Sequence, residues 1–458
     1  MIEIVTGMSS QSPILATATE SSNGPIVLTG VLLSLVVVYI ASKVGGELSK
    51  LLNLPSVLGE LVAGVIIGIS ALHLLVFPET GAVAADSGIM SVLQLIDNLS
   101  PAALTSIFES QSEVISVLAE LGVIILLFEI GLESDIKELK EVGYQAAIVA
   151  VVGAVVPFAA GTVGLMYLFN ISTIPAFFAG AALTATSIGI TAKVLSELGQ
   201  LKSKEGQIIV GAAVIDDVLG IIVLAVVASL AKTGEVDIAN VIYLIISATV
   251  FLLGAIFLGQ FFNKTFSLIA ARLQTRGQLV IPALTFAFFM AFIANAIHLE
   301  AILGAFAAGL VLEETDQRKE LDLQIIAIAD ILVPIFFVTI GAKTDLGVLS
   351  PAIPENREGL IIAVFLVVIA IFTKLITGWT VFGQAKINRF AIGVGMVPRG
   401  EVGLVFAAIG SATGALNKPL EAAIIIMVIL TTFVAPPCLR LAFKDSEEIS
   451  ESVEKASS

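Results

Sequence analysis

Long apolar runs, separated by short polar segments, dominate the chain from residue 25 onward. Most of these runs are close to the roughly 20 residues that an α-helix needs to cross the hydrocarbon core of a bilayer. The thirteen expected spans cover residues 25–42, 54–76, 114–132, 143–169, 175–197, 206–231, 238–262, 279–297, 300–313, 325–342, 360–383, 389–412 and 419–439. The pattern therefore predicts an all-α integral membrane protein with thirteen transmembrane helices.

Composition supports this class and excludes others. Of the 458 residues 57% are hydrophobic and only 13% are charged, whereas soluble domains have about a quarter charged residues. The net charge of −15 argues against nucleic acid as a partner. The only cysteine, Cys438, excludes an internal disulfide and a cysteine-cluster metal site. We expect no cofactor and no enzymatic activity.

The distribution of basic residues predicts the orientation in the membrane. If the N-terminal segment 1–24 is non-cytoplasmic, most of the 23 Lys and Arg residues fall in cytoplasmic loops or in the C-terminal tail, 442–458. This agrees with the positive-inside rule and with an odd number of spans. Residues 77–113 contain no Lys or Arg and are expected to form an acidic connector between the second and third spans.

A weak internal repeat relates the two halves of the chain. The stretch LPSVLGELVAGVIIG (54–68) resembles LEAILGAFAAGLVLE (299–313), and LLFEIGLESDI (126–136) resembles FFVTIGAKTDL (336–346). Seven spans separate the members of each pair, so the two copies enter the membrane in opposite directions. Inverted repeats are typical of secondary transporters, whose substrate site lies near the midplane where the repeats meet.

Four charged residues inside the apolar spans are the first candidates for chemistry, because each costs about 2.5–3.5 kcal/mol to insert. They are Asp216 and Asp217 in the sixth span, Lys374 in the eleventh and Glu129 in the third. Consecutive helical residues point about 100° apart, so one aspartate can pair with Lys374 while the other faces a hydrated cavity. Burial and a nearby cation act in opposite directions on a carboxyl group, which lets a proton and a small hard cation compete for it.

Two spans contain signals of an interrupted helix. GAALTATSIGITAK (180–193) concentrates Thr and Ser residues, including Thr186 and Ser187, in the fifth span. GVGMVPRGEVGLVFAA (393–408) places a proline and several glycines in the twelfth, the matching span of the other repeat. Interrupted segments at corresponding positions of two repeats indicate a transporter's binding site. Arg399 and Glu401 could offset the partial charges of the half-helix ends.

Taken together, the motifs VIDDVLG (214–220), LTATSIGITAKVL (183–195), FTKLITG (372–378) and VPRGEVGLVFAAIG (397–410) resemble those of sodium/proton antiporters of the cation:proton antiporter-2 family. The resemblance covers about residues 25–440 and is nearest to a cyanobacterial member. It implies a homodimer that works by an elevator movement. The ion-transporting core would be 143–232 and 359–441, the dimerisation domain 25–142 and 277–358, and the linker with the seventh span 233–276.

The resemblance also assigns roles to individual residues. Asp217 would bind the cation or the proton, and Asp216 would form a salt bridge to Lys374 that breaks when the cation arrives. The remaining assignments are Thr186 and Ser187 lining the ion site, and Arg399 and Glu401 compensating helix ends. Glu129 has no counterpart in the family pattern and leaves open a further protonation step.

The expected activity is electrogenic exchange of Na⁺ for H⁺, because the Asp-Asp form with lysine is associated with electrogenic members. Carboxylate and hydroxyl oxygens also suit Li⁺ and K⁺. A K⁺/H⁺ antiporter or a K⁺ efflux system of the same family therefore stays open. The expected location is the plasma membrane, or the thylakoid membrane in a cyanobacterium, with lipid around the spans.

Overall fold

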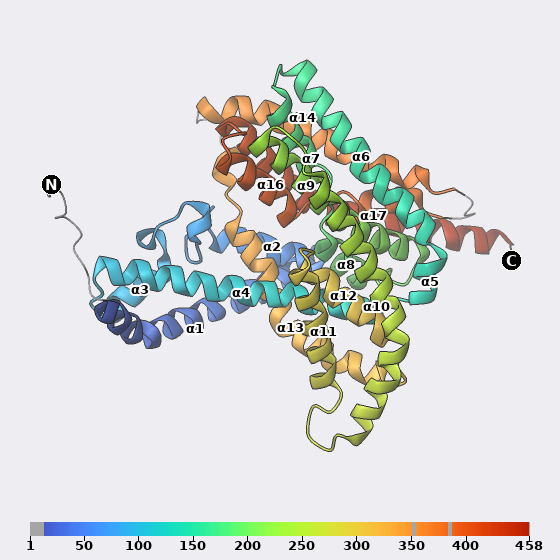
Figure 1. Ribbon diagram of the computed structural model, residues 1–458, viewed down its shortest axis with the longest axis horizontal. Helices are drawn as coiled ribbons and strands as arrows, with labels where there is room; N and C mark the ends of the chain where they lie inside the picture. The colour runs from blue at the N-terminus through green and yellow to red at the C-terminus, as the bar shows by residue number, and fades with distance from the viewer. Residues whose placement is uncertain (1–12, 350–353, 383–386, 458) are drawn as a thin grey trace, which may run out of the picture.

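The fold is a bundle of α-helices with short connections (Figure 1). The structure is a computed structural model that describes residues 13–349, 354–382 and 387–457, and within these residues it contains no β-strand. The helices are α1 (Pro13–Leu51), α2 (Ser56–Ile67), η1 (Pro78–Thr80), η2 (Ala84–Asp86), α3 (Gly88–Ile96), α4 (Pro101–Glu133), α5 (Ile136–Glu141), α6 (Gly143–Leu168), α7 (Thr173–Ala182), α8 (Ile188–Glu197), α9 (Lys204–Thr233), α10 (Ile238–Arg272), α11 (Val280–Ala296), α12 (Ala301–Glu313), α13 (Arg318–Lys343), η3 (Leu346–Leu349), α14 (Pro354–Thr377), η4 (Gly378–Thr380), α15 (Arg389–Gly395), α16 (Glu401–Ala412) and α17 (Lys418–Ser457).

These helices confirm the expected class of an all-α membrane protein. Among the described residues, eight helices are long and apolar enough to cross a bilayer, and several shorter apolar helices, including α2, α11 and α12, accompany them. Every one of the thirteen expected spans contains one helix or two consecutive helices. The number of membrane crossings and the inverted repeat stay predictions.

The connector expected at 77–113 differs from the structure. It contains η1, η2 and α3, and α4 already begins at Pro101, after Ser100, whose side chain accepts a hydrogen bond from the Ala103 amide. Ser at the cap and Pro in the first helical position are strong start signals. Leu104, Ile107 and Phe108 are buried at helical spacing, so this part of α4 is amphipathic and no uniformly apolar run marks it.

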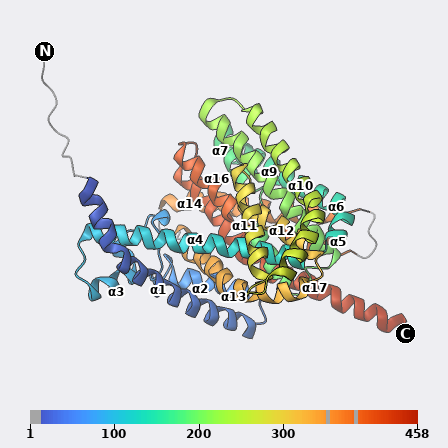
Figure 2. The same cartoon turned by 60° about the horizontal axis from the view of Figure 1, so that its bottom comes forward.

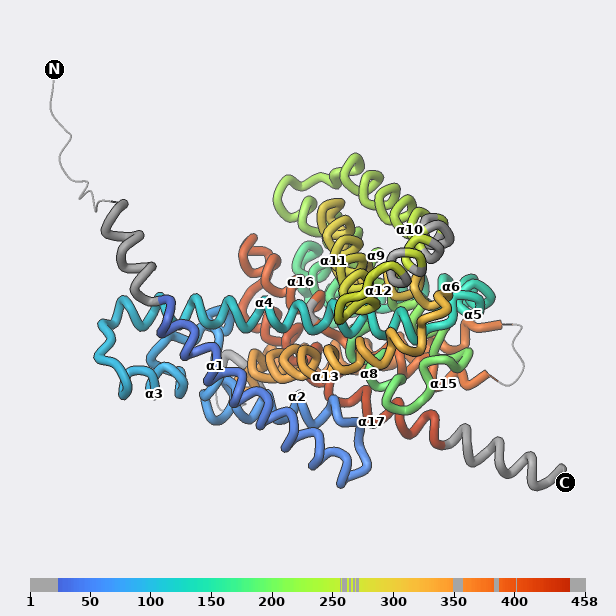
Figure 3. Tube along the Cα trace, turned by 90° about the horizontal axis from the view of Figure 1, so that it is seen from below, coloured from blue at the N-terminus to red at the C-terminus, as the bar shows by residue number. Residues whose placement is uncertain are grey.

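The start of α1 also differs from the expectation. The helix begins at Pro13 and includes the second half of the segment 1–24, which was expected to precede the first span. The first half, residues 1–12, lies outside the described residues. Around Gly30 and Ser34, α1 runs beside α3 and α4, and this part of the bundle extends away from the other helices (Figures 1 and 3).

The helices pack in two groups (Figures 1 and 2). In the first, called the scaffold group here, α4 packs against α12 and α13, α2 packs against α1 and α13, and α11 packs against α12. In the second, called the core group, α6 packs against α7, α9 and α14, while α17 packs against α14 and α16. The assignment of these groups to a dimerisation domain and a moving core stays a prediction.

Two close helix contacts in the scaffold group depend on glycine. A Cβ atom on Gly131 or on Gly309 would overlap the backbone of the facing helix, and the same is true of Gly64 and Gly341. Small residues let helix backbones approach closely where lipid provides no hydrophobic driving force. In the sequence repeat Gly64 corresponds to Gly309 and Gly131 to Gly341. The two contacts therefore join equivalent positions, which supports the repeat.

Candidate functional site

The expected interruption of the fifth and twelfth spans is confirmed. Residues 183–187 separate α7 from α8, and residues 396–400 separate α15 from α16. The two breaks lie against each other, because the Ser187 amide donates a hydrogen bond to the Pro398 carbonyl at 2.9 Å. Thr191, one turn into α8, donates to the Gly395 carbonyl at 3.0 Å. The contact brings four helix ends together inside the bundle.

Pro398 and Gly400 explain the break between α15 and α16. Pro398 has no amide proton and disfavours a helical conformation of the residue before it. Gly400 precedes α16 with extended backbone angles, and a Cβ atom there would lie 2.8 Å from the Ser187 hydroxyl oxygen and 2.9 Å from its Cβ. A side chain at position 400 would therefore displace Ser187, and glycine allows the two breaks to meet at this point.

A buried ion pair lies directly beside the breaks. Lys374 of α14 and Asp216 of α9 are both 0% exposed, and the Lys374 Nζ lies 2.9 Å from the Asp216 Oδ2. The same ammonium donates to the Thr186 hydroxyl at 3.0 Å. The Thr186 hydroxyl in turn lies 2.7 Å from the Asp216 Oδ2 and 3.2 Å from the Met396 carbonyl. Because a hydroxyl has one proton, Thr186 can donate to only one of these acceptors at a time.

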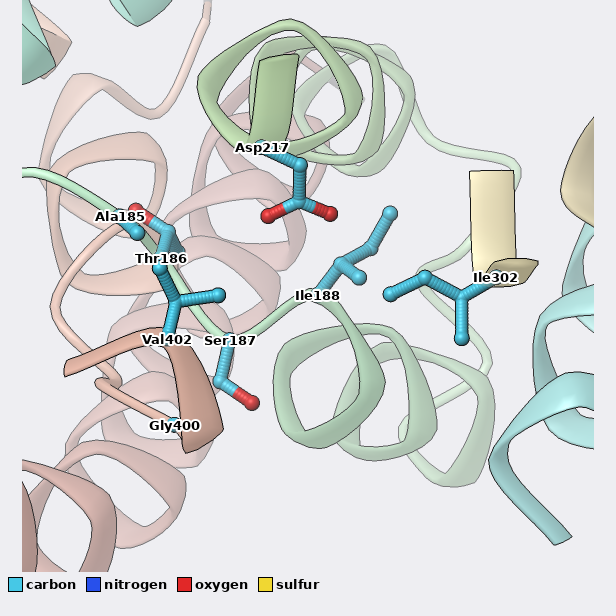
Figure 4. A pocket seen from close by; sticks show the side chains of 8 residues that line it. All are labelled: Ala185, Thr186, Ser187, Ile188, Asp217, Ile302, Gly400 and Val402. Atoms are coloured by element: carbon cyan, nitrogen blue, oxygen red, sulfur yellow. The ribbon is translucent and has the colours of Figure 1, made fainter. Parts of the chain in front are cut away.

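Asp217 points away from this ion pair, as helical geometry requires for adjacent residues. Its side chain is 3% exposed and lines a small cavity of about 10 Å³, which is close to the volume that one water molecule needs (Figure 4). The other lining residues are Ala185, Thr186, Ser187, Ile188, Ile302, Gly400 and Val402. Ile302 belongs to α12, so the scaffold group closes one side of a cavity that the two breaks, α8, α9 and α16 otherwise form.

Arg399 lies in the break between α15 and α16 and is 0% exposed. Its Nη1 donates hydrogen bonds to the carbonyls of Ala185 at 3.1 Å and Met396 at 3.3 Å, which follow the C-terminal ends of α7 and α15. A positive charge is favourable there because helix C-termini carry partial negative charge. Glu401 is the first residue of α16, and its side chain lies outside the described part of the chain.

The structure does not bring Glu129 to this cavity. It is 7% exposed in the last part of α4, where Lys193 of α8 is among the charges that act on it. The Glu129 Oε2 has no hydrogen-bond partner among the described residues.

Thr432 is a contact residue that the sequence did not indicate. Its hydroxyl, on α17, donates to the Arg399 carbonyl in the break. A threonine in an apolar helix usually bonds to its own backbone, so no local signal distinguishes this one.

The fold and the site define a class of protein. Two interrupted helices meet inside a helical membrane bundle, beside a buried carboxylate and a buried lysine–aspartate pair, and this combination is typical of secondary transporters. The family model for the transmembrane part of sodium/hydrogen exchangers matches residues 31–444. The chain therefore belongs to the sodium/hydrogen exchanger family, as its motifs predicted, and this is a family of transporters.

Individual relatives agree with this assignment. The chain is 60% identical over 438 residues to the high-affinity Na⁺/H⁺ antiporter NhaS3 of the cyanobacterium Synechocystis sp., covering 95% of each protein. It is 33% identical over 410 residues to the Na⁺/H⁺-K⁺ antiporter GerN of Bacillus cereus, covering 89% of this chain and 94% of the relative. The solved structure of the sodium proton antiporter MjNhaP1 from Methanocaldococcus jannaschii has the same fold. Its TM-score is 0.61 at 16% identity, over 91% of this chain and 99% of that one.

Proposed function

We propose that the protein is a secondary active Na⁺/H⁺ antiporter in which the cation and the proton compete for Asp217. The observation that carries the proposal is the position of this carboxylate. It lines a cavity between two helix breaks, while the adjacent Asp216 is held by Lys374. The likeness to antiporters that exchange Na⁺ supports the choice of ions.

The oxygen atoms around the cavity suit a small hard cation. Asp217, Thr186 and Ser187 line the same space, and their side chains carry the oxygen atoms that such cations prefer as ligands. Thr186 also contacts both members of the ion pair. A cation that attracts the Thr186 oxygen therefore disturbs the bond between Asp216 and Lys374, and this gives the cation a route to break the salt bridge.

Alternating access would come from an elevator movement of the core group against the scaffold group. Ile302 of α12 lies at the boundary between the groups, so a shift of the core would carry Asp217 from one side of the membrane towards the other. Moving an empty, charged site through the membrane is costly, so the movement would require bound cation or proton. We further propose a homodimer and electrogenic exchange.

Three residues have supporting roles in this proposal. Arg399 would balance the partial negative charge at the C-terminal ends of α7 and α15 during the movement, through the hydrogen bonds described above. Glu401 would act in the same way at the start of α16. Glu129, which is not among the residues that line the cavity, would take part in a separate protonation step near α8.

The protein would act in the plasma membrane, or in the thylakoid membrane of a cyanobacterial host. Its N-terminus would be non-cytoplasmic and its C-terminus cytoplasmic, as the basic loops predict.

The test is ion exchange by purified protein in proteoliposomes that contain a pH-sensitive dye. Addition of Na⁺ should collapse an imposed pH gradient with wild-type protein, and Asp217→Asn should abolish this response. Asp97→Asn is the matched control, because Asp97 is exposed and lies far from Asp217 in the sequence, and this variant should transport normally. Exchange that persists in Asp217→Asn would refute Asp217 as the binding site of the cation and the proton.

The same assay with K⁺ tests the second candidate function, K⁺/H⁺ exchange, which the likeness to the Na⁺/H⁺-K⁺ antiporter GerN favours. A response to K⁺ but not to Na⁺ would retain Asp217 as the site and replace the transported ion. A response to neither cation would refute antiport.

A further inference from the structure

Gly153 lies in the interior of α6 and is buried. Glycine in the middle of a helix lowers stability relative to alanine, so a buried one there usually has a specific reason. At Gly153 the reason is visible in the neighbouring atoms. A Cβ atom would lie 3.0 Å from the Lys374 Nζ, 3.6 Å from the Lys374 Cδ and 3.5 Å from the Thr377 Cγ2. The lysine side chain therefore occupies the space that a side chain at position 153 would take.

The ammonium group has little room on its other side. Its nitrogen lies 2.9 Å from the Asp216 Oδ2 and 3.0 Å from the Thr186 Oγ1, and both distances are ordinary for hydrogen bonds. Such bonds do not shorten much below about 2.7 Å, so the nitrogen has only a few tenths of an ångström to give on this side. A methyl group at position 153 requires a displacement of at least this size, so it would disturb the two hydrogen bonds of the ammonium group.

Two other glycines in the interior of α6 have different neighbours. A Cβ on Gly161 would meet the Leu183 side chain, and one on Gly164 would meet the Phe365 ring. These two glycines allow close packing of carbon atoms. Gly153 differs from them because the atom it accommodates is the charged end of Lys374.

We propose that Gly153 is a positioning residue for ion exchange, which seats the Lys374 ammonium against the α6 backbone so that it reaches Asp216 and Thr186 together. The role in exchange rests on the proposed function, whereas the placement of the Lys374 ammonium against Gly153 does not. Since a displaced ammonium holds Asp216 less firmly, a side chain at position 153 makes it easier for a cation to replace Lys374.

The first test is a double-mutant cycle in thermal stability. Gly153→Ala should lower the Tm of the wild-type protein, by on the order of 2 °C or more. In the Lys374→Ala background the ammonium is absent, so the same substitution should leave the Tm unchanged or raise it, as alanine does in most helices. Gly143→Ala is the control, because a Cβ at this position of α6 meets nothing within 4 Å. Its effect should be equal in both backgrounds.

If the Lys374→Ala protein does not fold, the double variant Asp216→Asn with Lys374→Ala, which lacks both charges, replaces it as the background of the cycle. An equal loss of Tm from Gly153→Ala in the wild type and in a background without Lys374 would overturn the proposal, because it would mean simple helix packing.

The second test is the Na⁺ dependence of exchange in proteoliposomes at several pH values. Gly153→Ala should lower the apparent KM for Na⁺ by about threefold or more and shift the pH profile, while Gly143→Ala changes neither. A changed rate with unaltered KM and pH profile would overturn the positioning role. If Gly153→Ala lowers the Tm only when Lys374 is present, but the protein exchanges no cation, the placement of the ammonium by Gly153 would be supported and the proposed function would be refuted.

Discussion

The Asp216–Lys374 ion pair gives the sharpest quantitative prediction. Both side chains are fully buried, with 2.9 Å between the Nζ and the Oδ2. Lys374→Ala leaves the Asp216 charge in the bundle without its cation, and loss of one partner of a buried pair costs about 3–5 kcal/mol. In Asp216→Asn with Lys374→Ala no such charge remains. We therefore expect the double variant to be more stable than the sum of the single effects by about 2 kcal/mol.

The assay is the free energy of unfolding of wild type, both single variants and the double variant, by denaturant titration in mixed micelles. The only tryptophan in the sequence, Trp379, lies in η4 directly after α14 and reports on this region. The space left by the shorter side chain is present in the single and the double variant, so its cost cancels in the cycle. Effects that add within about 0.5 kcal/mol would refute a coupled pair.

A surface ion pair provides the matched control. Lys343 and Glu79 lie 2.7 Å apart, but their side chains are 27% and 64% exposed. Water screens such a pair, and its contribution to stability is usually below about 1 kcal/mol. Glu79→Gln should therefore cost much less than Lys374→Ala. Similar costs at both sites would mean that burial does not determine the strength of the inner pair.

Two further predictions concern the breaks. Thr186→Val removes the hydroxyl that contacts Asp216 and Lys374, and should reduce Na⁺-driven exchange in proteoliposomes by about tenfold or more, whereas Thr186→Ser should retain it. Equal rates in the valine and serine variants would contradict this role. Gly400→Ala places a methyl group against Ser187, and should lower the Tm by several degrees and stop exchange. A Gly400→Ala protein with wild-type Tm and rate would show that the breaks need not meet closely.

The breaks and the divergent aspartates were predictable because they follow from local chemistry. Pro398, which has no amide proton, lies among several glycines, and this combination marks one break, whereas Pro157 and Pro334 lie inside continuous helices. A run of Thr and Ser marks the partner break. Adjacent helical residues diverge by about 100°, so the sequence alone separates Asp216 from Asp217. The early start of α4 was also readable from its cap and its amphipathic spacing. Because this part of α4 is amphipathic, no uniformly apolar run marks its start.

The sequence by itself determined the membrane class, most of the helix segments, the positions of the interruptions and the inventory of buried charges. Each of these depends on hydropathy or on backbone chemistry within a few neighbouring residues. Only the tertiary structure decided which groups meet. Thr186 joins Asp216 to Lys374, Ile302 closes the cavity, and Gly153 receives the ammonium, across helices far apart in the chain. Such contacts depend on how helices pack and rotate against one another, and no local pattern of residues specifies that.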